Sequence, residues 1–166
     1  LWGGQAELKR ARTYLPPFAC SIMQSIMEYE TDGTYDILSA VLIPAVCDTL
    51  KCFGQKWKGT CPAIPFVHPQ NRRDDHSVAF LTSEYQMIRK KLEEILQVEI
   101  TDQKISESII LYNEYRSVMR EFTGLAADYP LTITPTVRHK IIKAGYFMEK
   151  AEYIAIMKQI ISGLRL

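Results

Sequence analysis

Two of the four cysteines stand at matching positions, after an apolar run and before a helical pattern. Cys20 follows the run Tyr14–Ala19, and Cys47 follows the longer aliphatic run Ile37–Val46. Ligands of open α/β sheets bind beyond the carboxyl ends of the strands, so we expect both thiols to face one crevice. Each thiol would also lie at a helix N-terminus, where the helix dipole and free N–H groups favour the thiolate. Thiolates bind zinc and iron–sulfur clusters, which predicts a two-cysteine site, although both positions also suit small buried apolar side chains.

The other two cysteines have a different context. Cys52 lies in a short helical pattern that begins at Asp48, and Cys61 lies in a Gly-Thr-Cys-Pro turn. Neither follows a strand, and the C-x2-C pairs typical of zinc sites are missing. We therefore interpret Cys52 and Cys61 as bystanders.

A polar loop, His68–Arg73, follows a third apolar run. This loop can hold an anionic group such as a CoA phosphate, or it can be a solvated loop that caps the next helix. The sequence contains no nucleophile elbow, P-loop, dinucleotide-binding glycine motif or zinc-binding helix motif. The cysteine pair is thus the main chemical signal.

The composition is that of an ordinary globular protein, with 166 residues, 47% of them hydrophobic and 23% charged. A formal net charge of +1 provides no basic field for nucleic acid or for an anionic membrane. The apolar stretch Ile37–Cys47 falls far short of the ~20 residues of a membrane span. The cysteine content favours reduced cytoplasmic thiols. The N-terminus has neither a Met nor a signal core, which we interpret as a piece of a longer protein rather than a processed chain.

The elements that must position the cysteines follow a β-α-β pattern in the first part of the chain. Apolar runs predict strands over Tyr14–Ala19, Ile37–Val46 and Ala63–Val67. A helix is expected from Cys20 to Asp32-Gly33, and a shorter one from an N-cap at Asp48 to Gly59. Pro16 and Pro17 weaken the first strand because proline cannot donate to a ladder.

The second part is predicted to be helical throughout. Apolar residues recur every three or four positions over Ser77–Gln97, which indicates an amphipathic helix. Thr101 is expected to cap a helix that ends near Ala126, and Thr134-Pro135 to begin one that ends near Gly145. A last helix is expected over Glu149–Ser162.

The fold class is therefore α/β, a small Rossmann-like parallel sheet unit followed by a run of packed helices. We predict a partial Rossmann-like domain over residues 1–76, and over residues 77–166 a helical region that packs on it and leads to a second α/β domain. Two or three strands make a thin sheet, so we expect the missing strands to lie outside this chain.

Read as strings, several segments resemble the 2-hydroxyacyl-CoA dehydratase family, which includes the benzoyl-CoA reductase subunits. The resemblance extends over nearly the whole chain, and its most specific part is CDTLK after an aliphatic strand, with a second cysteine upstream. The segments are YLPPFAC (14–20), LIPAVCDTLK (42–51), VHPQNR (67–72), YNEYR (112–116) and FM (147–148).

The resemblance implies a 4Fe-4S cluster held by three cysteines, two in a first α/β domain and one in a second. The first two match Cys20 and Cys47, and the third is expected outside this chain. The implied subunit belongs to a heterodimer with a second dehydratase subunit, in an anaerobic cytoplasmic enzyme of amino-acid fermentation.

The implied reaction is the elimination of water from an (R)-2-hydroxyacyl-CoA through a ketyl radical. One electron comes from a separate ATP-dependent iron–sulfur activator. The alternatives are a benzoyl-CoA-reductase-like subunit, which reduces an aromatic acyl-CoA, and a non-catalytic assembly or interaction domain. The same motifs also suit a subunit whose cluster only relays electrons. We expect the isolated chain to be folded but inactive, since two thiolates leave the cluster short of a ligand.

Overall fold

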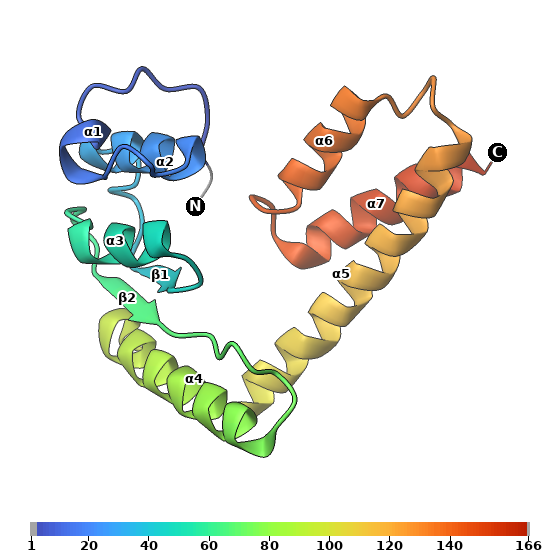
Figure 1. Ribbon diagram of the computed structural model, residues 1–166. Helices are drawn as coiled ribbons and strands as arrows, with labels where there is room; N and C mark the ends of the chain where they lie inside the picture. Colours follow the sequence, from blue (N-terminus) through green and yellow to red (C-terminus); the bar gives the residue numbers. More distant parts are fainter. Residues whose placement is uncertain (1–2, 166) are drawn as a thin grey trace. The chain divides into compact units, whose positions relative to one another are not determined.

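The computed structural model describes residues 3–165, and the chain forms two compact units, Leu1–Glu99 and Ile100–Leu166 (Figure 1). The first unit contains a two-stranded parallel sheet with helices, and the second contains helices only within its described residues. This architecture confirms the predicted α/β class with packed helices. Residues 3–165 contain no helix that is both long and apolar enough to cross a membrane.

The sheet of the first unit is short. Strand β1 (Val41–Pro44) pairs in parallel with β2 (Ala63–Phe66), with Val41 opposite Ala63 and Pro44 opposite Phe66. Helix α3 (Asp48–Lys56) connects the two strands, as a β-α-β crossover requires. Strand β1 is shorter than the predicted run Ile37–Val46, because the run begins in a turn, where the Leu38 N–H donates to the Tyr35 carbonyl at 3.0 Å, and ends where the Val46 N–H donates to the Pro44 carbonyl at 2.9 Å.

The strand predicted over Tyr14–Ala19 is wrong. Helix α1 (Ala11–Tyr14) occupies the start of this segment, and a turn follows it. Pro16 and Pro17 have no N–H to donate to a ladder, and the Ala19 N–H donates instead to the Pro16 carbonyl at 2.9 Å. Cys20 therefore follows a turn and not a strand.

Helix α2 (Ser21–Thr31) holds α1 in place through one carboxylate. Glu28 is buried and accepts backbone N–H bonds from Lys9 at 3.0 Å, from Arg10 at 2.9 Å and from Ala11 at 2.9 Å. These amides stand at the start of α1, where N–H groups lack helical partners. Burial opposes ionisation of Glu28, but these amides outweigh it and lower the pKa of the carboxyl.

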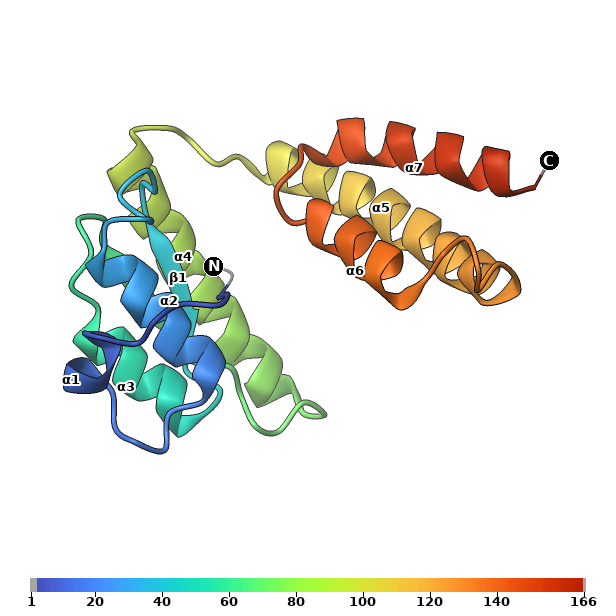
Figure 2. The same cartoon turned by 90° about the horizontal axis from the view of Figure 1, so that it is seen from above.

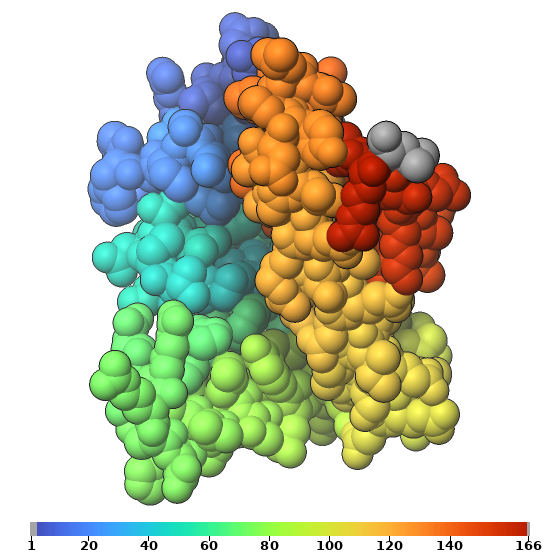
Figure 3. Space-filling view, turned by 90° about the vertical axis from the view of Figure 1, so that its right-hand side faces the viewer, coloured from blue at the N-terminus to red at the C-terminus, as the bar shows by residue number. Residues whose placement is uncertain are grey.

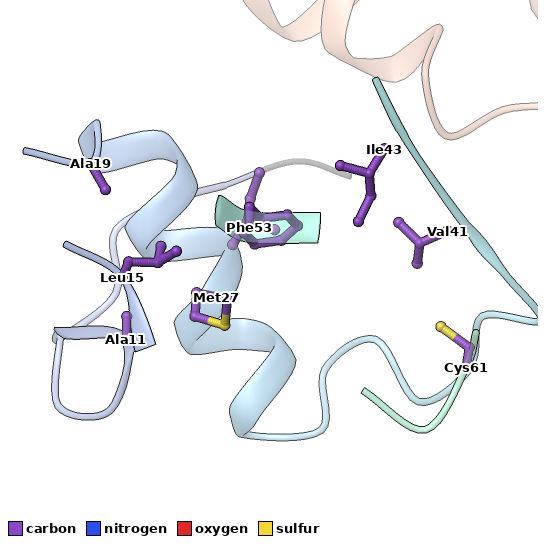
Figure 4. Close-up of a cluster of buried hydrophobic side chains, with 9 residues drawn as sticks. Ala11, Leu15, Ala19, Met27, Val41, Ile43, Phe53 and Cys61 are labelled. Carbon is purple, nitrogen blue, oxygen red and sulfur yellow. The ribbon is translucent and has the colours of Figure 1, made fainter. Parts of the chain in front are cut away.

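The inner faces of α2, α3 and β1 meet in one core (Figure 4). Met27 of α2 and Phe53 of α3 are among the most deeply buried side chains of the chain. The buried members of this cluster are Ala11, Leu15, Ala19, Ile26, Met27, Val41, Ile43, Phe53 and Cys61.

Helix α4 (Asp75–Leu96) completes the first unit and contacts β2. Its N-cap Asp74 accepts from the Ser77 N–H at 2.7 Å, and the Val67 N–H donates to Glu84 at 2.7 Å. The chain leaves α4 at Gln97 with a left-handed φ of 53°. The helix predicted over Ser77–Gln97 is therefore confirmed.

The second unit is built on α5 (Asp102–Asp128), α6 (Pro135–Ala144) and α7 (Lys150–Leu164). Helix α7 lies against α5, as the views in Figures 2 and 3 show. The predicted caps are confirmed, because Thr101 accepts from the Lys104 N–H at 3.2 Å and Thr134 from the Val137 N–H at 3.4 Å. The domain division at residues 76/77 and the second α/β domain stay predictions.

Candidate functional site

Cys20 is the N-cap residue of α2 and is exposed to solvent. Its carbonyl accepts from the Gln24 N–H at 3.0 Å, which is the first helical bond. Its sulfur caps no backbone amide. The first N–H groups of a helix have no partners within that helix, so the sulfur stands beside backbone donors.

Cys47 is the N-cap residue of α3 and is exposed as well. Its sulfur accepts from the Leu50 N–H at 3.4 Å, in the position that a Ser or Asp cap usually fills. The prediction that Asp48 is the N-cap is therefore wrong by one residue. Asp48 is the first helical residue, and its carboxylate pairs with Lys51 at 3.5 Å. The acidic group still complements the positive end of the helix.

The two thiols share an edge of the first unit. Helices α2 and α3 contact each other, and in Figures 1 and 2 both begin at the end of the unit toward which β1 points. Cys47 follows β1 by three residues and matches the predicted strand-to-helix position, whereas Cys20 reaches the same end from a turn. Exposure of both thiols argues against the alternative that they are small core residues.

Cys61 lies elsewhere in the unit. It is buried and precedes β2, at the amino end of the parallel sheet, and Figure 4 shows it on the far side of the core from Ala19. Burial raises the pKa of its thiol, and the carboxylates of Asp36 and Glu30 add to the rise. This thiol stays protonated more readily than an exposed one, which disfavours metal binding.

Cys52 is half-buried within α3, five residues after Cys47. Five residues rotate a side chain by about 140° around an α-helix. The side chain of Cys52 therefore points to a different side of α3 from the side chain of Cys47.

The polar loop before α4 has a capping role. Asp74 accepts from the Ser77 N–H, the Asn71 side-chain amide also donates to Asp74, and the Arg73 N–H donates to Asn71 at 3.0 Å. The Ser77 backbone bond is the main cause that lowers the pKa of Asp74. These bonds match the predicted cap for the next helix.

Two buried carboxylates of α2, Glu28 and Glu30, are not among the residues predicted from the sequence. Glu28 holds the start of α1, and Glu30 accepts from the Lys58 N–H at 2.9 Å. Their burial could have been suspected from the sequence, because both acids stand next to Tyr29, and Glu28 also next to Met27, in a helix expected to be apolar on one face.

Cys20 and Cys47, at the shared edge of the first unit, provide only some of the ligands that an iron–sulfur or zinc centre needs. Cys20 and Cys47 provide two exposed sulfurs, which are the ligand type of an iron–sulfur cluster. Within residues 3–165, no group of three or more His, Cys, Asp or Glu side chains could hold a metal ion. The two thiols therefore match the ligand type of a cluster but are too few to hold one by themselves.

Comparison with known proteins assigns the family. The family model for the 2-hydroxyglutaryl-CoA dehydratase D-component matches residues 1–166. The chain belongs to this family, in agreement with the resemblance of its cysteine segments.

Among its relatives, the lactoyl-CoA dehydratase subunit beta of Anaerotignum propionicum is 48% identical over 166 residues, or 99% of this chain and 44% of the relative. The (R)-phenyllactyl-CoA dehydratase beta subunit of Clostridium sporogenes is 40% identical over 168 residues, which cover 99% of this chain and 45% of the relative. A benzoyl-CoA reductase subunit of Thauera aromatica is 26% identical over 164 residues, which cover 97% of this chain and 42% of the relative. The chain thus spans less than half the length of these relatives.

Proposed function

We propose that this chain is part of the iron–sulfur subunit of a 2-hydroxyacyl-CoA dehydratase. The proposed reaction is the elimination of water from an (R)-2-hydroxyacyl-CoA to give the 2-enoyl-CoA. The family match supports this assignment, as do the two dehydratase relatives at 48% and 40% identity. The reductase relative is more distant, at 26%, so the dehydratase is favoured over a benzoyl-CoA-reductase-like subunit.

Cys20 and Cys47 are the residues that we propose to hold a 4Fe-4S cluster. The observation that carries this assignment is their shared position as exposed N-cap residues of two contacting helices. The first-turn N–H groups of both helices would donate to the thiolates, as Leu50 already does to Cys47. A cubane bound by two thiolates lacks a protein ligand on at least one further iron, so the third ligand is assigned to the longer protein.

The scaffold suits this role because both helices are fixed by one core. Met27 of α2 and Phe53 of α3 pack in the same buried cluster as Ile43 of β1 (Figure 4). The N-termini of α2 and α3 are therefore held by buried contacts on both helices, which a rigid cluster requires of its ligands. The thiols of Cys20 and Cys47 are exposed and are not part of this core.

When bound, the cluster would supply the single electron that makes the unactivated β-proton of the substrate removable, after an ATP-dependent activator has delivered it. The residues of this chain would hold the cluster through the sulfurs of Cys20 and Cys47. A second subunit would complete the enzyme, in keeping with the subunit names of the relatives.

The test uses the full-length protein with its second subunit, the activator and ATP under anaerobic conditions. (R)-Lactoyl-CoA and (R)-phenyllactyl-CoA are the probes, and formation of the 2-enoyl-CoA is measured. We expect Cys20→Ser and Cys47→Ser each to reduce turnover at least about 100-fold, because a lost metal ligand removes the cofactor.

Cys52→Ser is the matched control, since it changes the same atom within α3 and should keep the parent rate. Turnover by Cys20→Ser and Cys47→Ser at the parent rate would contradict the assignment. Reduction of benzoyl-CoA without any water elimination would support the reductase alternative instead. Absence of both reactions from a folded complex would support the non-catalytic assembly domain.

A further inference from the structure

Three exposed apolar side chains stand beside the two cysteines that we propose as cluster ligands. Phe18 precedes Cys20 by two residues and is 70% exposed, and Ile22, in the first turn of α2, is exposed as well. Val46 directly precedes Cys47 and is 52% exposed. We call Phe18, Ile22 and Val46 the apolar border. Single exposed apolar residues are common on protein surfaces, but these three flank both thiols of one site.

The turn before α2 directs Phe18 and Cys20 to the same side of the chain. Ala19, which lies between them, is only 5% exposed and packs in the core, whereas its two neighbours are exposed. The Ala19 N–H donates to the Pro16 carbonyl at 2.9 Å and so fixes this turn. The Cα atoms of Phe18 and Cys20 lie at most about 7 Å apart, because two residues reach no further. The phenyl ring is therefore within reach of a group bound to the Cys20 sulfur.

Val46 has the same relation to the second thiol. Its N–H donates to the Pro44 carbonyl at 2.9 Å, at the end of β1, and the next residue is the exposed Cys47. The Cα atoms of Val46 and Cys47 are about 3.8 Å apart across the peptide bond. The border thus supplies an apolar side chain next to each of the two ligands.

Apolar side chains beside an iron–sulfur cluster affect its reduction. A 4Fe-4S cluster bound by thiolates carries a net negative charge, and this charge increases when the cluster accepts one electron. Water stabilises the more negative form more strongly than apolar groups do. Apolar groups that exclude water therefore disfavour the reduced form and lower the reduction potential.

We propose that Phe18, Ile22 and Val46 shield the cluster from water and thereby lower its reduction potential. These side chains bind no iron, and they act only through the surroundings of the cluster. Because the shielded group is the cluster of the proposed function, this role rests on that function. The electron comes from the activator in the proposed reaction and from titanium(III) citrate in the test below.

The test is a redox titration of the full-length protein without oxygen, in which the reduced cluster is measured by electron paramagnetic resonance. We expect Phe18→Ser to favour reduction at least about tenfold, which is an upward shift of about 59 mV for one electron. Val46→Ser should shift the potential in the same direction. Phe18→Leu keeps an apolar side chain and should keep a potential near that of the parent.

Ile37→Ser is the matched control. Ile37 is an exposed apolar residue of the same unit, but it precedes β1 and so lies toward the amino end of the sheet, away from Cys47. This variant should keep the parent potential. Phe18→Ser should also lose iron in air at least about threefold faster than the parent, while its iron content without oxygen and its melting temperature stay unchanged.

The possible outcomes separate this role from the proposed function. A full iron content with an unchanged or lower potential in Phe18→Ser would overturn the shielding role and leave the two ligands in place. A lower melting temperature with an unchanged potential would overturn it too, and would assign Phe18 to a contact with another part of the longer protein. A parent protein without iron and sulfide would overturn the proposed function, and the shielding role with it.

Discussion

Cys20 and Cys47 occupy the same helical position, the N-cap, on the two contacting helices α2 and α3. The sulfur of Cys47 accepts from the Leu50 N–H at 3.4 Å, while the sulfur of Cys20 caps no amide. Both sulfurs are exposed, and both stand beside the first N–H groups of a helix, which lack partners within that helix. Their placement suits thiolate ligands better than core packing.

Thiol reactivity should separate these cysteines from Cys61. We expect iodoacetamide to modify Cys20 and Cys47 in the cluster-free chain at pH 8 at least about ten times faster than Cys61, because thiolate and exposure control the rate. Burial, with help from Asp36 and Glu30, raises the pKa of Cys61, so its rate should still increase at higher pH. Mass spectrometry of peptides over time measures the rates. Equal labelling of Cys61 in the folded chain would show that this thiol is accessible.

Glu28→Gln should destabilise the first unit. The carboxylate accepts from the backbone amides of Lys9, Arg10 and Ala11. Glutamine carries no charge and has one acceptor oxygen instead of two, so these hydrogen bonds become weaker or are lost. We expect a loss of about 1–3 kcal/mol in the free energy of unfolding at pH 7, measured by urea denaturation.

The effect of Glu28 depends on pH. Its pKa is lowered from 4.5 in the folded chain, so the stabilisation is complete above that value and is lost as pH falls through the folded pKa. The difference between parent and Glu28→Gln should therefore shrink below about pH 4. Glu7→Gln, an exposed change, is the control. A difference that grows in acid would contradict this account.

Tyr153→Phe should weaken the second unit. The buried Tyr153 hydroxyl donates to the Ile141 carbonyl at 2.7 Å and so connects α7 to α6. We expect a loss of about 1 kcal/mol at neutral pH. Tyr129→Phe, which changes a more exposed tyrosine, should cost less.

An alkaline titration provides a second measure of Tyr153. Burial, and to a smaller extent the neighbouring Tyr115, raises the pKa of Tyr153 to about 12. Its stabilising contribution is complete below its ordinary value of 10.0 and is lost as pH rises toward 12. Burial also raises the pKa of Tyr35 to about 12, so the phenolate absorbance step near pH 12 should lose part of its amplitude in Tyr153→Phe, and Tyr35 should account for the rest. A Tyr153→Phe titration that keeps the full amplitude of that step would assign it to other tyrosines.

Local signals predicted the helices well, because caps and apolar periodicity act over a few residues. Thr101 and Thr134 cap α5 and α6 as expected, and α4 follows the predicted periodicity. The run Tyr14–Ala19 misled the prediction, since Leu15 and Ala19 pack into the core from a turn that contains Pro16 and Pro17.

The site could be predicted only where a strand precedes a helix. Cys47 follows β1, so its place at the carboxyl edge followed from the pattern. Glu30 could not be found this way, because its burial depends on the loop that carries Lys58, 28 residues later in the chain. Contacts between segments that lie far apart in the chain produce no periodic pattern in the sequence.

The most direct measurement of the central claim is the iron and acid-labile sulfide content of the full-length protein purified without oxygen. We predict about four of each per subunit for the parent and for Cys52→Ser, and a large loss of both in Cys20→Ser and Cys47→Ser. The isolated 166-residue chain, reconstituted with iron and sulfide, should not retain an intact cluster. Full iron and sulfide in Cys20→Ser and Cys47→Ser, or a stable stoichiometric cluster in the isolated chain, would contradict the assignment.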